Sequence, residues 1–324
     1  MADRLGWGII GCGDVVVKKS GPSILQAGGS RIVAVMRRDV NKARPFAEAN
    51  RIPLCTADAA EVIDHRDVDI VYVSTPPSSH KEYVLAAARA GKHVLVEKPM
   101  GLSAAEDRDM IAACERAGVE LFVAYYRRFH PHVLKMKELI DSGRIGRIIT
   151  AQVDFAQPPI PGYDWGWRVQ PEVSGGGLFV DVVTHRIDLM VSLLGEPQDV
   201  CGHSNTIDPA NRAEETVTLA VKFRSGALCS VSGDFASARQ ADRFVITGAR
   251  GEIVSERLDG HSFSLRVGKS VEEFHFDPFP APHLGMIRHI ERVLAGQEPN
   301  LSPGTQGRLT DVILDRGLRQ IPPC

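Results

Sequence analysis

The sequence predicts two domains of different fold class: an α/β domain on a doubly wound parallel sheet, then an α+β domain on a large, mostly antiparallel, open-faced sheet. Residues 1–124 alternate short apolar runs with helical stretches, which is typical of a parallel sheet covered by helices on both faces. Residues 125–324 contain several segments in which apolar and polar positions alternate, separated by tight turns. A length of 324 residues is about twice that of a usual domain, which also favours two domains.

The strands predicted in the first region are continuous apolar runs, as the interior of a parallel sheet requires. They are Trp7–Ile10, Arg31–Met36, Val68–Val73, His93–Val96 and Glu120–Ala124. The helices expected among these strands are Asp14–Ala27, Asn41–Asn50, Ser79–Ala90 and Ser103–Ala117. Ser79 with Glu82 and Ser103 with Glu106 have the spacing of a capping box, which supports the starts of these two helices.

The second region begins with a helix, Pro131–Ser142, and a strand, Ile148–Phe155. A loop rich in proline, glycine and aromatic residues, Gln157–Trp167, leads to a glycine triplet that opens a helix over Gly177–Leu194. The alternating strands that follow are Asp199–Ile207, Glu215–Phe223, Ala227–Phe235, Asp242–Thr247, Glu252–Arg257 and Val271–Phe276. One face of their sheet is expected to pack on helices. The other face is left open, and such a face often becomes a subunit contact, so we expect a homodimer or homotetramer.

Composition excludes several classes of function. The net charge is −2 and no block of like charges occurs, so no nucleic-acid partner is expected. No apolar run approaches the roughly 18 residues that span a bilayer, and the first residues do not resemble a signal peptide, so we expect a cytoplasmic protein without membrane contact. The six cysteines are scattered, without zinc spacing, which favours reduced thiols.

A glycine-rich turn between the first strand and the first helix predicts a dinucleotide site. The segment Gly11-Cys-Gly13-Asp14-Val15-Val16 is the fingerprint of a Rossmann domain with valine in place of the third glycine. The two glycines allow a tight turn and a close approach of backbone to pyrophosphate, which would lie at the helix N-terminus beside Asp14 and Val15. A glycine-rich turn alone is a weak signal, but its place between strand and helix favours cofactor binding.

Two arginines bear on the choice of cofactor. NAD-specific sites usually place a carboxylate at the end of the second strand, whereas arginine accommodates the 2′-phosphate of NADP. Arg37 occupies that position with Arg38 beside it, so NADP is favoured and NAD stays possible. The alternative is a pair of solvated arginines next to Asp39.

Two further segments lie at the carboxyl ends of strands, where ligands of open α/β sheets bind. Ser74-Thr75-Pro76 follows the third strand and is expected to line the cofactor; His80, just beyond, fits a cofactor contact or an ordinary helix residue equally well. Glu97-Lys98-Pro99 follows the fourth strand, where Lys98 would face the nicotinamide. A cationic ring nearby would make this lysine a better proton acceptor. The alternative for Glu97 and Lys98 is a surface ion pair.

Three polar residues share one face of the helix that follows the glycine triplet. Asp181, His185 and Asp188 stand at i, i+4 and i+7 among apolar neighbours, which is unusual for a core helix. The set suits a proton relay in which a carboxylate orients an imidazole that meets a substrate hydroxyl. A buried histidine bridging two carboxylates is the alternative. A metal is not expected, because the trio lacks a further ligand of the usual histidine-rich kind.

These motifs together resemble the Gfo/Idh/MocA oxidoreductases, a family that includes glucose-fructose oxidoreductase and inositol dehydrogenase. The matching segments are Gly11-x-Gly13, Ser74-Thr-Pro76, Ala90–Pro99, and Gly175–Gly177 with Asp181 and His185. The resemblance implies a Rossmann domain, here 1–124, and an α/β substrate-binding and oligomerisation domain, 125–324. It also implies Lys98, Asp181 and His185 as the catalytic set. Val16 and Arg37 depart from the family's usual glycine and acidic residue.

Family members mostly oxidise or reduce a hydroxyl or carbonyl carbon of sugars, polyols and cyclic alcohols, so a sugar-like substrate is expected. Further substrate contacts are expected from an arginine and from aromatic and arginine residues before the triplet, because such side chains suit a sugar ring. They are Arg128, Tyr163, Trp167 and Arg168. Two other hypotheses remain open. One is a redox-neutral enzyme that uses NAD within a turnover for glycoside cleavage or elimination, and the other is a nicotinamide-sensing regulator.

Overall fold

The computed structural model describes residues 4–208 and 211–319, which divide into two compact units. The first unit comprises Met1–Gly101, Ala105–Tyr126 and Phe279–Gly307, and the second comprises Leu102–Ala104, Arg127–Pro278 and Arg308–Cys324. None of the helices within the described ranges combines the length and apolar character that a bilayer crossing needs.

The first unit is built on a six-stranded, all-parallel sheet in the order β3-β2-β1-β4-β5-β6. The strands are β1 (Leu5–Ile10), β2 (Ser30–Met36), β3 (Leu54–Thr56), β4 (Ile70–Val73), β5 (His93–Val96) and β6 (Leu121–Val123). Their side chains are almost all buried, as the continuous apolar runs predict. The strand order reverses direction beside β1, so β1 and β4 flank the switch point where such sheets bind ligands.

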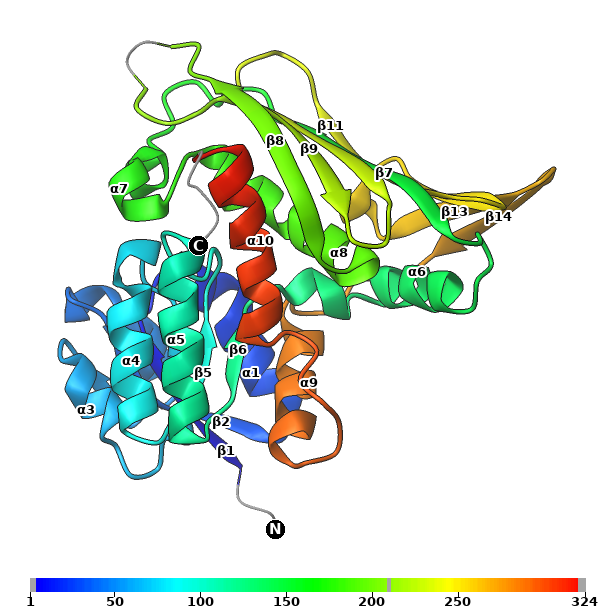
Figure 1. Cartoon of the computed structure of the whole chain (residues 1–324). Coiled ribbons are helices and arrows are strands. Elements are labelled where there is room, and N and C mark those ends of the chain that lie inside the picture. The colour runs from blue at the N-terminus through cyan, green and yellow to red at the C-terminus, as the bar shows by residue number, and fades with distance from the viewer. Residues whose placement is uncertain (1–3, 209–210, 320–324) are drawn as a thin grey trace. The chain divides into compact units, whose positions relative to one another are not determined.

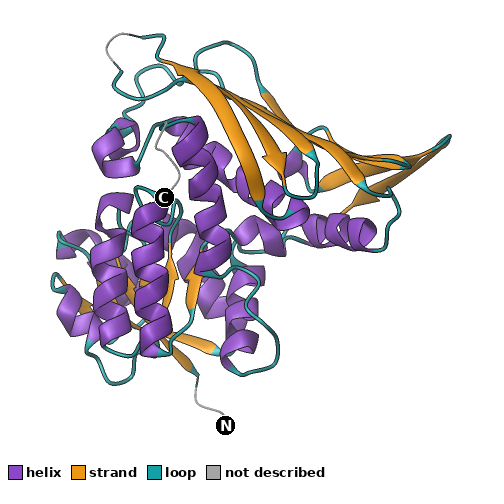
Figure 2. Ribbon diagram, in the orientation of Figure 1, coloured by secondary structure: helices purple, strands orange, loops and turns teal. Residues whose placement is uncertain are grey.

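Helices cover both faces of this sheet (Figures 1 and 2). They are α1 (Gly21–Ala27), α2 (Arg44–Ala49), α3 (Ala59–Ile63), α4 (His80–Arg89), α5 (Ala104–Ala117) and α9 (Leu284–Leu294). The predicted doubly wound parallel fold is confirmed. The sequence patterns did not identify β3, α3 or α9. The α9 helix packs on α1, and Glu291 accepts a hydrogen bond from Ser30, which in turn accepts one from the Trp7 indole.

The second unit is built on an eight-stranded sheet in the order β14-β13-β12-β11-β7-β10-β9-β8. The strands are β7 (Ile148–Ala156), β8 (Pro197–Asn205), β9 (Thr216–Phe223), β10 (Leu228–Asp234), β11 (Ala241–Gly248), β12 (Gly251–Ser255), β13 (Ser262–Val267) and β14 (Ser270–His275). Every pairing is antiparallel except that of β7 with β10. The predicted large, mostly antiparallel sheet is therefore confirmed, with β13 as an additional strand.

One face of the second sheet is covered and the other is not. The helices α6 (Pro131–Asp141), α8 (Thr184–Leu194) and α10 (Gly304–Gly317) contribute to the same core as the sheet's inward side chains. Along β9, burial alternates residue by residue, with Val217, Leu219 and Val221 inside and Thr218 and Ala220 outside. This period of two is what a sheet with one packed face requires.

One local expectation was wrong. Ser79 precedes α4, but its hydroxyl makes no capping bond to that helix; it donates to the Thr75 hydroxyl and lies 3.0 Å from the Pro76 carbonyl. The physical reason is that a short 3₁₀ turn, Pro77–Ser79, joins the loop to α4 and leaves Ser79 in a helical conformation rather than the extended one of a cap. Cys324 lies outside the described residues, and the other five cysteines are unpaired thiols.

Candidate functional site

Three loops meet at the carboxyl edge of the parallel sheet. The Gly11–Gly13 turn follows β1, the Ser74–Pro76 segment follows β4, and Glu97–Pro99 follows β5; these three strands are neighbours in the sheet. The sheet thus brings the predicted cofactor motif and the predicted catalytic lysine to one edge of one unit.

The two glycines of the turn serve different purposes. Gly11 has φ +97°, and a Cβ there would lie 2.7 Å from the Ser74 carbonyl carbon, so both conformation and space require glycine. A Cβ on Gly13 would have no protein atom nearer than the Gly11 oxygen at 3.7 Å. The protein's own packing therefore does not require glycine at position 13, and the backbone there has space for another group to approach closely.

The helix after the turn contains a π-helical segment, Val16–Ser20, before α1. Val16, which replaces the third glycine of the motif, is fully buried at its start. Asp14 is exposed and pairs with Lys18 at 2.5 Å, while Val15 is half-buried. π-Helical segments inside helices occur often at functional sites. Val16 therefore lies buried at the start of a locally widened helical segment.

Arg37 lies beside the glycine turn. Its Nη1 donates to the Cys12 carbonyl at 3.0 Å, which fixes the guanidinium next to the turn, whereas Arg38 is exposed. The Cys12 thiol is buried, and burial raises its pKa to about 11 despite the Arg37 charge. That thiol is therefore a packed side chain rather than a nucleophile.

The loop after β4 is held by its own hydrogen bonds. The Ser74 hydroxyl lies 3.0 Å from the Gly11 carbonyl, which it can donate to, so Ser74 ties this loop to the glycine turn. His80 is fully buried, and its ring nitrogens face the carbonyls of Thr75 at 2.8 Å and of Pro99 and Met100 at 3.1 Å. His80 thereby joins the loop after β4 to the loop after β5.

The glutamate before Lys98 is buried and bonded within the same unit. The Tyr72 hydroxyl donates to Glu97 Oε1 at 2.5 Å, and the Lys98 backbone N–H donates to Glu97 Oε2 at 3.2 Å. Burial raises the pKa of Glu97, an effect that the Lys98 charge and the Tyr72 bond oppose. Lys98 itself is half-buried, and its peptide bond to Pro99 is cis. Glu97 thus anchors the backbone from which Lys98 extends.

In the second unit, the glycine triplet is explained by a close approach of backbone. Gly175 has φ +79°, and a Cβ on Gly177 would lie 2.7 Å from the Glu214 carbonyl oxygen. The Glu214 carboxylate accepts the Gly177 N–H at 2.7 Å, and burial raises the pKa of that carboxyl. Sequence reasoning missed Glu214, because nothing in its local pattern indicates the partner lying far along the chain.

Three of the predicted site residues are brought together just before α8. The Arg168 guanidinium stacks 4.6 Å from the Trp167 ring centre, and its Nε lies 3.2 Å from Asp181 Oδ2. Asp181 belongs to a second π-helical segment, Phe179–Val183, which runs directly into α8. The Trp167 indole thus orients Arg168, and Arg168 in turn holds the Asp181 carboxylate within the π-helical segment.

The other two members of the polar trio lie deeper. Asp188 is fully buried and receives two bonds from Arg128, one of them from Nε at 2.7 Å. Burial raises the pKa of Asp188, and the Arg128 charge opposes that rise. Arg128 is itself only 7% exposed, so this pair ties the 3₁₀ turn Tyr126–Phe129 to α8. His185 is 8% exposed and lies between Asp181 and Asp188 in the chain.

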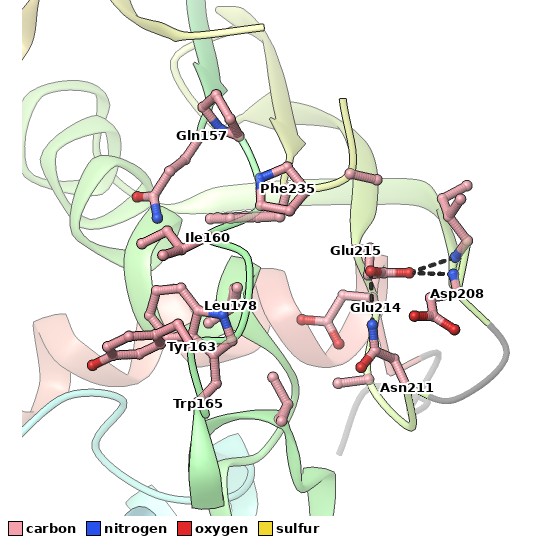
Figure 3. A pocket seen from close by; sticks show the side chains of 16 residues that line it. Gln157, Ile160, Tyr163, Trp165, Leu178, Asp208, Asn211, Glu214, Glu215 and Phe235 are labelled. Atoms are coloured by element: carbon pink, nitrogen blue, oxygen red, sulfur yellow. Dashed lines mark hydrogen bonds between the residues drawn. The ribbon is translucent and has the colours of Figure 1, made fainter. Parts of the chain in front are cut away.

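A cavity of about 400 Å³ opens beside the aromatic loop of the second unit, within the size range of small-molecule sites. Figure 3 shows Tyr163 and Trp165 on one side and Asp208, Asn211, Glu214 and Glu215 on the other. The Tyr163 and Trp165 rings are 4.6 Å apart, and Tyr163 is 55% exposed. Glu215 accepts from the Ile207 and Asp208 N–H groups and from Asn211, so this wall is prearranged.

Two family models match the chain. One, described as an oxidoreductase family with an NAD-binding Rossmann fold, matches residues 5–125, and the other, described as a GFO/IDH/MocA C-terminal domain, matches residues 133–254. Oxidoreductase P35 of Formosa agariphila is 36% identical over 283 residues, which cover 86% of this chain and 87% of that protein. The 1,5-anhydro-D-fructose reductase of Ensifer adhaerens is 30% identical over 254 residues, 78% of this chain and 76% of the relative.

Solved structures with the same fold cover almost the whole chain. An aldose-aldose oxidoreductase from Caulobacter crescentus complexed with glycerol matches with a TM-score of 0.85 and 27% identity, over 98% of both chains. A levoglucosan dehydrogenase in complex with NADH and levoglucosan matches with a TM-score of 0.89 and 22% identity, over 98% of this chain and 97% of that one. The second likeness shows the fold alone.

Proposed function

Because this chain belongs to the GFO/IDH/MocA family of NAD(P)-dependent oxidoreductases, we propose that it moves a hydride between a nicotinamide cofactor and a secondary alcohol or carbonyl of a sugar, polyol or related cyclic alcohol. The observation that carries this proposal is the shared edge of the parallel sheet. There the glycine turn follows β1 and the Glu97-Lys98-Pro99 segment follows β5, with only β4 between these two strands. A nucleotide cradle and an amine thus stand at the same edge of the same sheet.

The residues present fit a dinucleotide. The open face of Gly13 leaves backbone accessible where the helix begins, and an anion there would meet the helix N-terminus. We assign the holding of the cofactor to this turn with Asp14 and Val15, to the Ser74–Pro76 loop, and to the Glu97–Lys98 segment. His80 contributes by fixing the two loops to each other. When bound, the nicotinamide supplies the hydride acceptor or donor.

The chain's own residues would manage the proton. In our proposal, Lys98 accepts or returns the proton of the reacting hydroxyl, and the His185 imidazole relays it. Asp181 orients the substrate, and Arg168 holds Asp181 at 3.2 Å so that its carboxylate keeps one direction. Asp188 and Arg128, which are buried against each other, act as positioning residues that fix the first turns of α8.

A sugar-like substrate is supported by side chains and by relatives. Tyr163, Trp167 and Arg168 offer the aromatic faces and the guanidinium that suit a polyhydroxylated ring. Two proteins that this chain resembles at 27% identity or more are named for aldose and anhydro-sugar chemistry.

We further propose that NADP is preferred over NAD. Arg37 directly follows β2 beside the glycine turn, where its guanidinium lies next to the Cys12 carbonyl and can meet a 2′-phosphate together with Arg38. The Arg37→Asp variant should lower the ratio of kcat/KM with NADP⁺ to that with NAD⁺ by roughly tenfold or more. The Arg31→Asp variant, at an exposed position on the same strand, is the matched control. An unchanged ratio in Arg37→Asp would remove Arg37 from cofactor selection.

The open face of the eight-stranded sheet supports the proposal of a homo-oligomer. Ala220 and Gln152 flank Ser230 across neighbouring strands, and all three side chains are exposed and small or uncharged. Light scattering after gel filtration should give a dimer or tetramer for the wild type. The Ala220→Arg variant should shift the mass toward the monomer. A monomeric wild type would refute this part of the proposal.

The activity itself is tested by nicotinamide absorbance, with NADP⁺ and NAD⁺ in parallel across sugars, inositols and cyclic diols. Reduction of cofactor by one member of the panel is the expected result. Silence across the panel together with cofactor released on denaturation would replace the proposal with the redox-neutral alternative. Silence with cofactor that binds reversibly but is never turned over would instead favour the nicotinamide-sensing alternative.

A further inference from the structure

Three histidines that the proposed reaction does not use lie together in the second unit. His130 and His132 stand at the start of α6, and His261 stands just after the 3₁₀ turn Leu258–Gly260, before β13. His132 and His261 are 129 positions apart in the chain, so no local motif indicates that they meet. We call His130, His132 and His261 the histidine cluster.

The geometry of the histidine cluster fits a metal ion. One ring nitrogen from each histidine lies within 4.8 Å of the others. The Nδ1 atoms of His132 and His261 are 3.3 Å apart. Two imidazole nitrogens bound to one tetrahedral Zn²⁺, each about 2.0–2.1 Å from the metal, are separated by roughly 3.3–3.4 Å. Two of the three ligands therefore already have the spacing of a chelate, and a ring nitrogen of His130 lies within 4.8 Å of both.

The surroundings hold two of the rings in place. His132 is 1% exposed and His130 7%, and His132 bonds to the Leu258 backbone, which fixes its ring orientation as partners of metal-bound histidines do. The Arg127 guanidinium is paired with the Asp259 carboxylate, which offsets its charge.

The backbone at His261 has a conformation that few residues other than glycine adopt. His261 has φ +55°, and among the described residues only Arg51 shares a positive φ outside glycine. His261 is the left-handed residue that ends the 3₁₀ turn Leu258–Gly260. This turn places the His261 ring beside His132, with their Nδ1 atoms 3.3 Å apart.

We propose that the histidine cluster is a binding site for a borderline transition-metal cation of the Zn²⁺ class, with three imidazole ligands and solvent in the fourth position. His261 is the half-buried member, so exchange with solvent occurs on its side. The ion joins the start of α6 to the start of β13. This role is separate from the proposed hydride transfer and does not depend on it.

The test is a Zn²⁺ titration of the full-length protein after chelator treatment, followed by calorimetry and by thermal unfolding. The wild type should bind one equivalent, and its midpoint of unfolding should rise with Zn²⁺, because a ligand that binds only the folded state stabilises it. The His261→Asn variant removes the imidazole but tolerates the left-handed backbone. Its affinity for Zn²⁺ should fall by more than the 10–100-fold that follows when a residue hydrogen-bonded to a metal ligand is removed.

The matched control is His203→Asn, at an exposed position on β8, which should bind Zn²⁺ as the wild type does. The His130→Gln variant gives a second test at the other end of the cluster and should also lose affinity. Absence of one-equivalent binding in the wild type, or equal affinity in wild type and His261→Asn, would overturn the proposal. Co²⁺ in place of Zn²⁺ distinguishes histidine ligands from a cysteine ligand. A thiolate charge-transfer band that disappears in Cys201→Ser would assign the ion to the exposed Cys201 and would also overturn the proposal.

Discussion

The glycine-rich edge of the first unit and the polar start of α8 in the second unit prepare chemistry in opposite ways. At the first, the proposed cofactor site depends on absent side chains: Gly11 lets the chain turn at φ +97°, and Gly13 leaves open backbone. At the second, the proposed substrate site depends on side chains that hold one another, with Arg168 on Asp181 and Arg128 on Asp188.

This difference determines how each region responds to substitution. At Gly13, where the backbone is open, a small added side chain is compatible with the fold, but it would lie where the cofactor is proposed to bind. A network of paired charges fails when one member is removed, because the remaining buried charge has lost its partner.

The largest effect is expected at Lys98. The Lys98→Ala variant should lower kcat by about 10²–10⁴-fold, the usual contribution of general acid–base catalysis, and change the dissociation constant for the cofactor far less than that. Steady-state kinetics and fluorescence titration measure the two quantities. The Lys81→Ala variant, at a surface lysine paired with Asp109 at 2.6 Å, is the control and should keep both. Near-normal turnover in Lys98→Ala would show that this lysine is not the base.

The next effect is on stability. Arg128→Met leaves Asp188 buried without its partner and should lower the free energy of unfolding by about 3–5 kcal/mol in urea titrations. The double variant Arg128→Met with Asp188→Leu should recover much of that loss. Arg224→Ala, which breaks an exposed pair with Glu196, should cost no more than about 1 kcal/mol. Equal losses at Arg128 and Arg224 would contradict the distinction between buried and exposed pairs.

The two glycines of the cofactor turn should separate folding from binding. Gly11→Ala places a Cβ against Ser74 in a left-handed backbone and should cost at least about 1–2 kcal/mol of stability. Gly13→Ala has space and should change stability by no more than about 0.5 kcal/mol. It should nevertheless weaken cofactor binding roughly tenfold or more. Unaltered cofactor affinity in Gly13→Ala would mean that the open backbone is not the cradle.

A smaller effect is expected on the stability of the protein at acidic pH. Burial lowers the pKa of His80 and outweighs the Thr75, Met100 and Pro99 carbonyls that face its ring, so the folded protein binds this proton at a lower pH than the unfolded chain, whose histidine has a pKa of about 6.5. The His80 contribution is complete above about pH 6.5 and is lost as pH falls below it, by up to about 1.4 kcal/mol per unit. The slope of unfolding free energy against pH from 5 to 6.5 should be shallower in His80→Gln. Identical slopes would refute this assignment.

The sequence predicted the fold where periodicity is strong. Continuous apolar runs identified β1, β2, β4 and β5, and alternation identified most of the second sheet. It missed β3 and α3, which are only three and five residues long, because such short elements lack a full period. Two helices late in the chain, α9 and α10, were not predicted either.

The candidate site was predictable to the extent that its residues are neighbours in sequence. Trp167, Arg168 and Asp181 were expected near one substrate, and the structure brings them together. The partnership of Arg128 with Asp188 was not expected, since sixty positions separate them. The π-helical turns at Val16 and Asp181 leave no sequence pattern, because they change the hydrogen bonding rather than the residue types.

Transfer of isotope from substrate to cofactor tests the central claim most directly. The alcohol identified by the absorbance panel, deuterated at its carbinol carbon, is incubated with NADP⁺ and the enzyme, and the reduced cofactor is analysed by mass spectrometry. Our account predicts one deuterium in each molecule of reduced cofactor. Substrate that is consumed without labelled cofactor, or label that returns to the product with no net reduction, would contradict it.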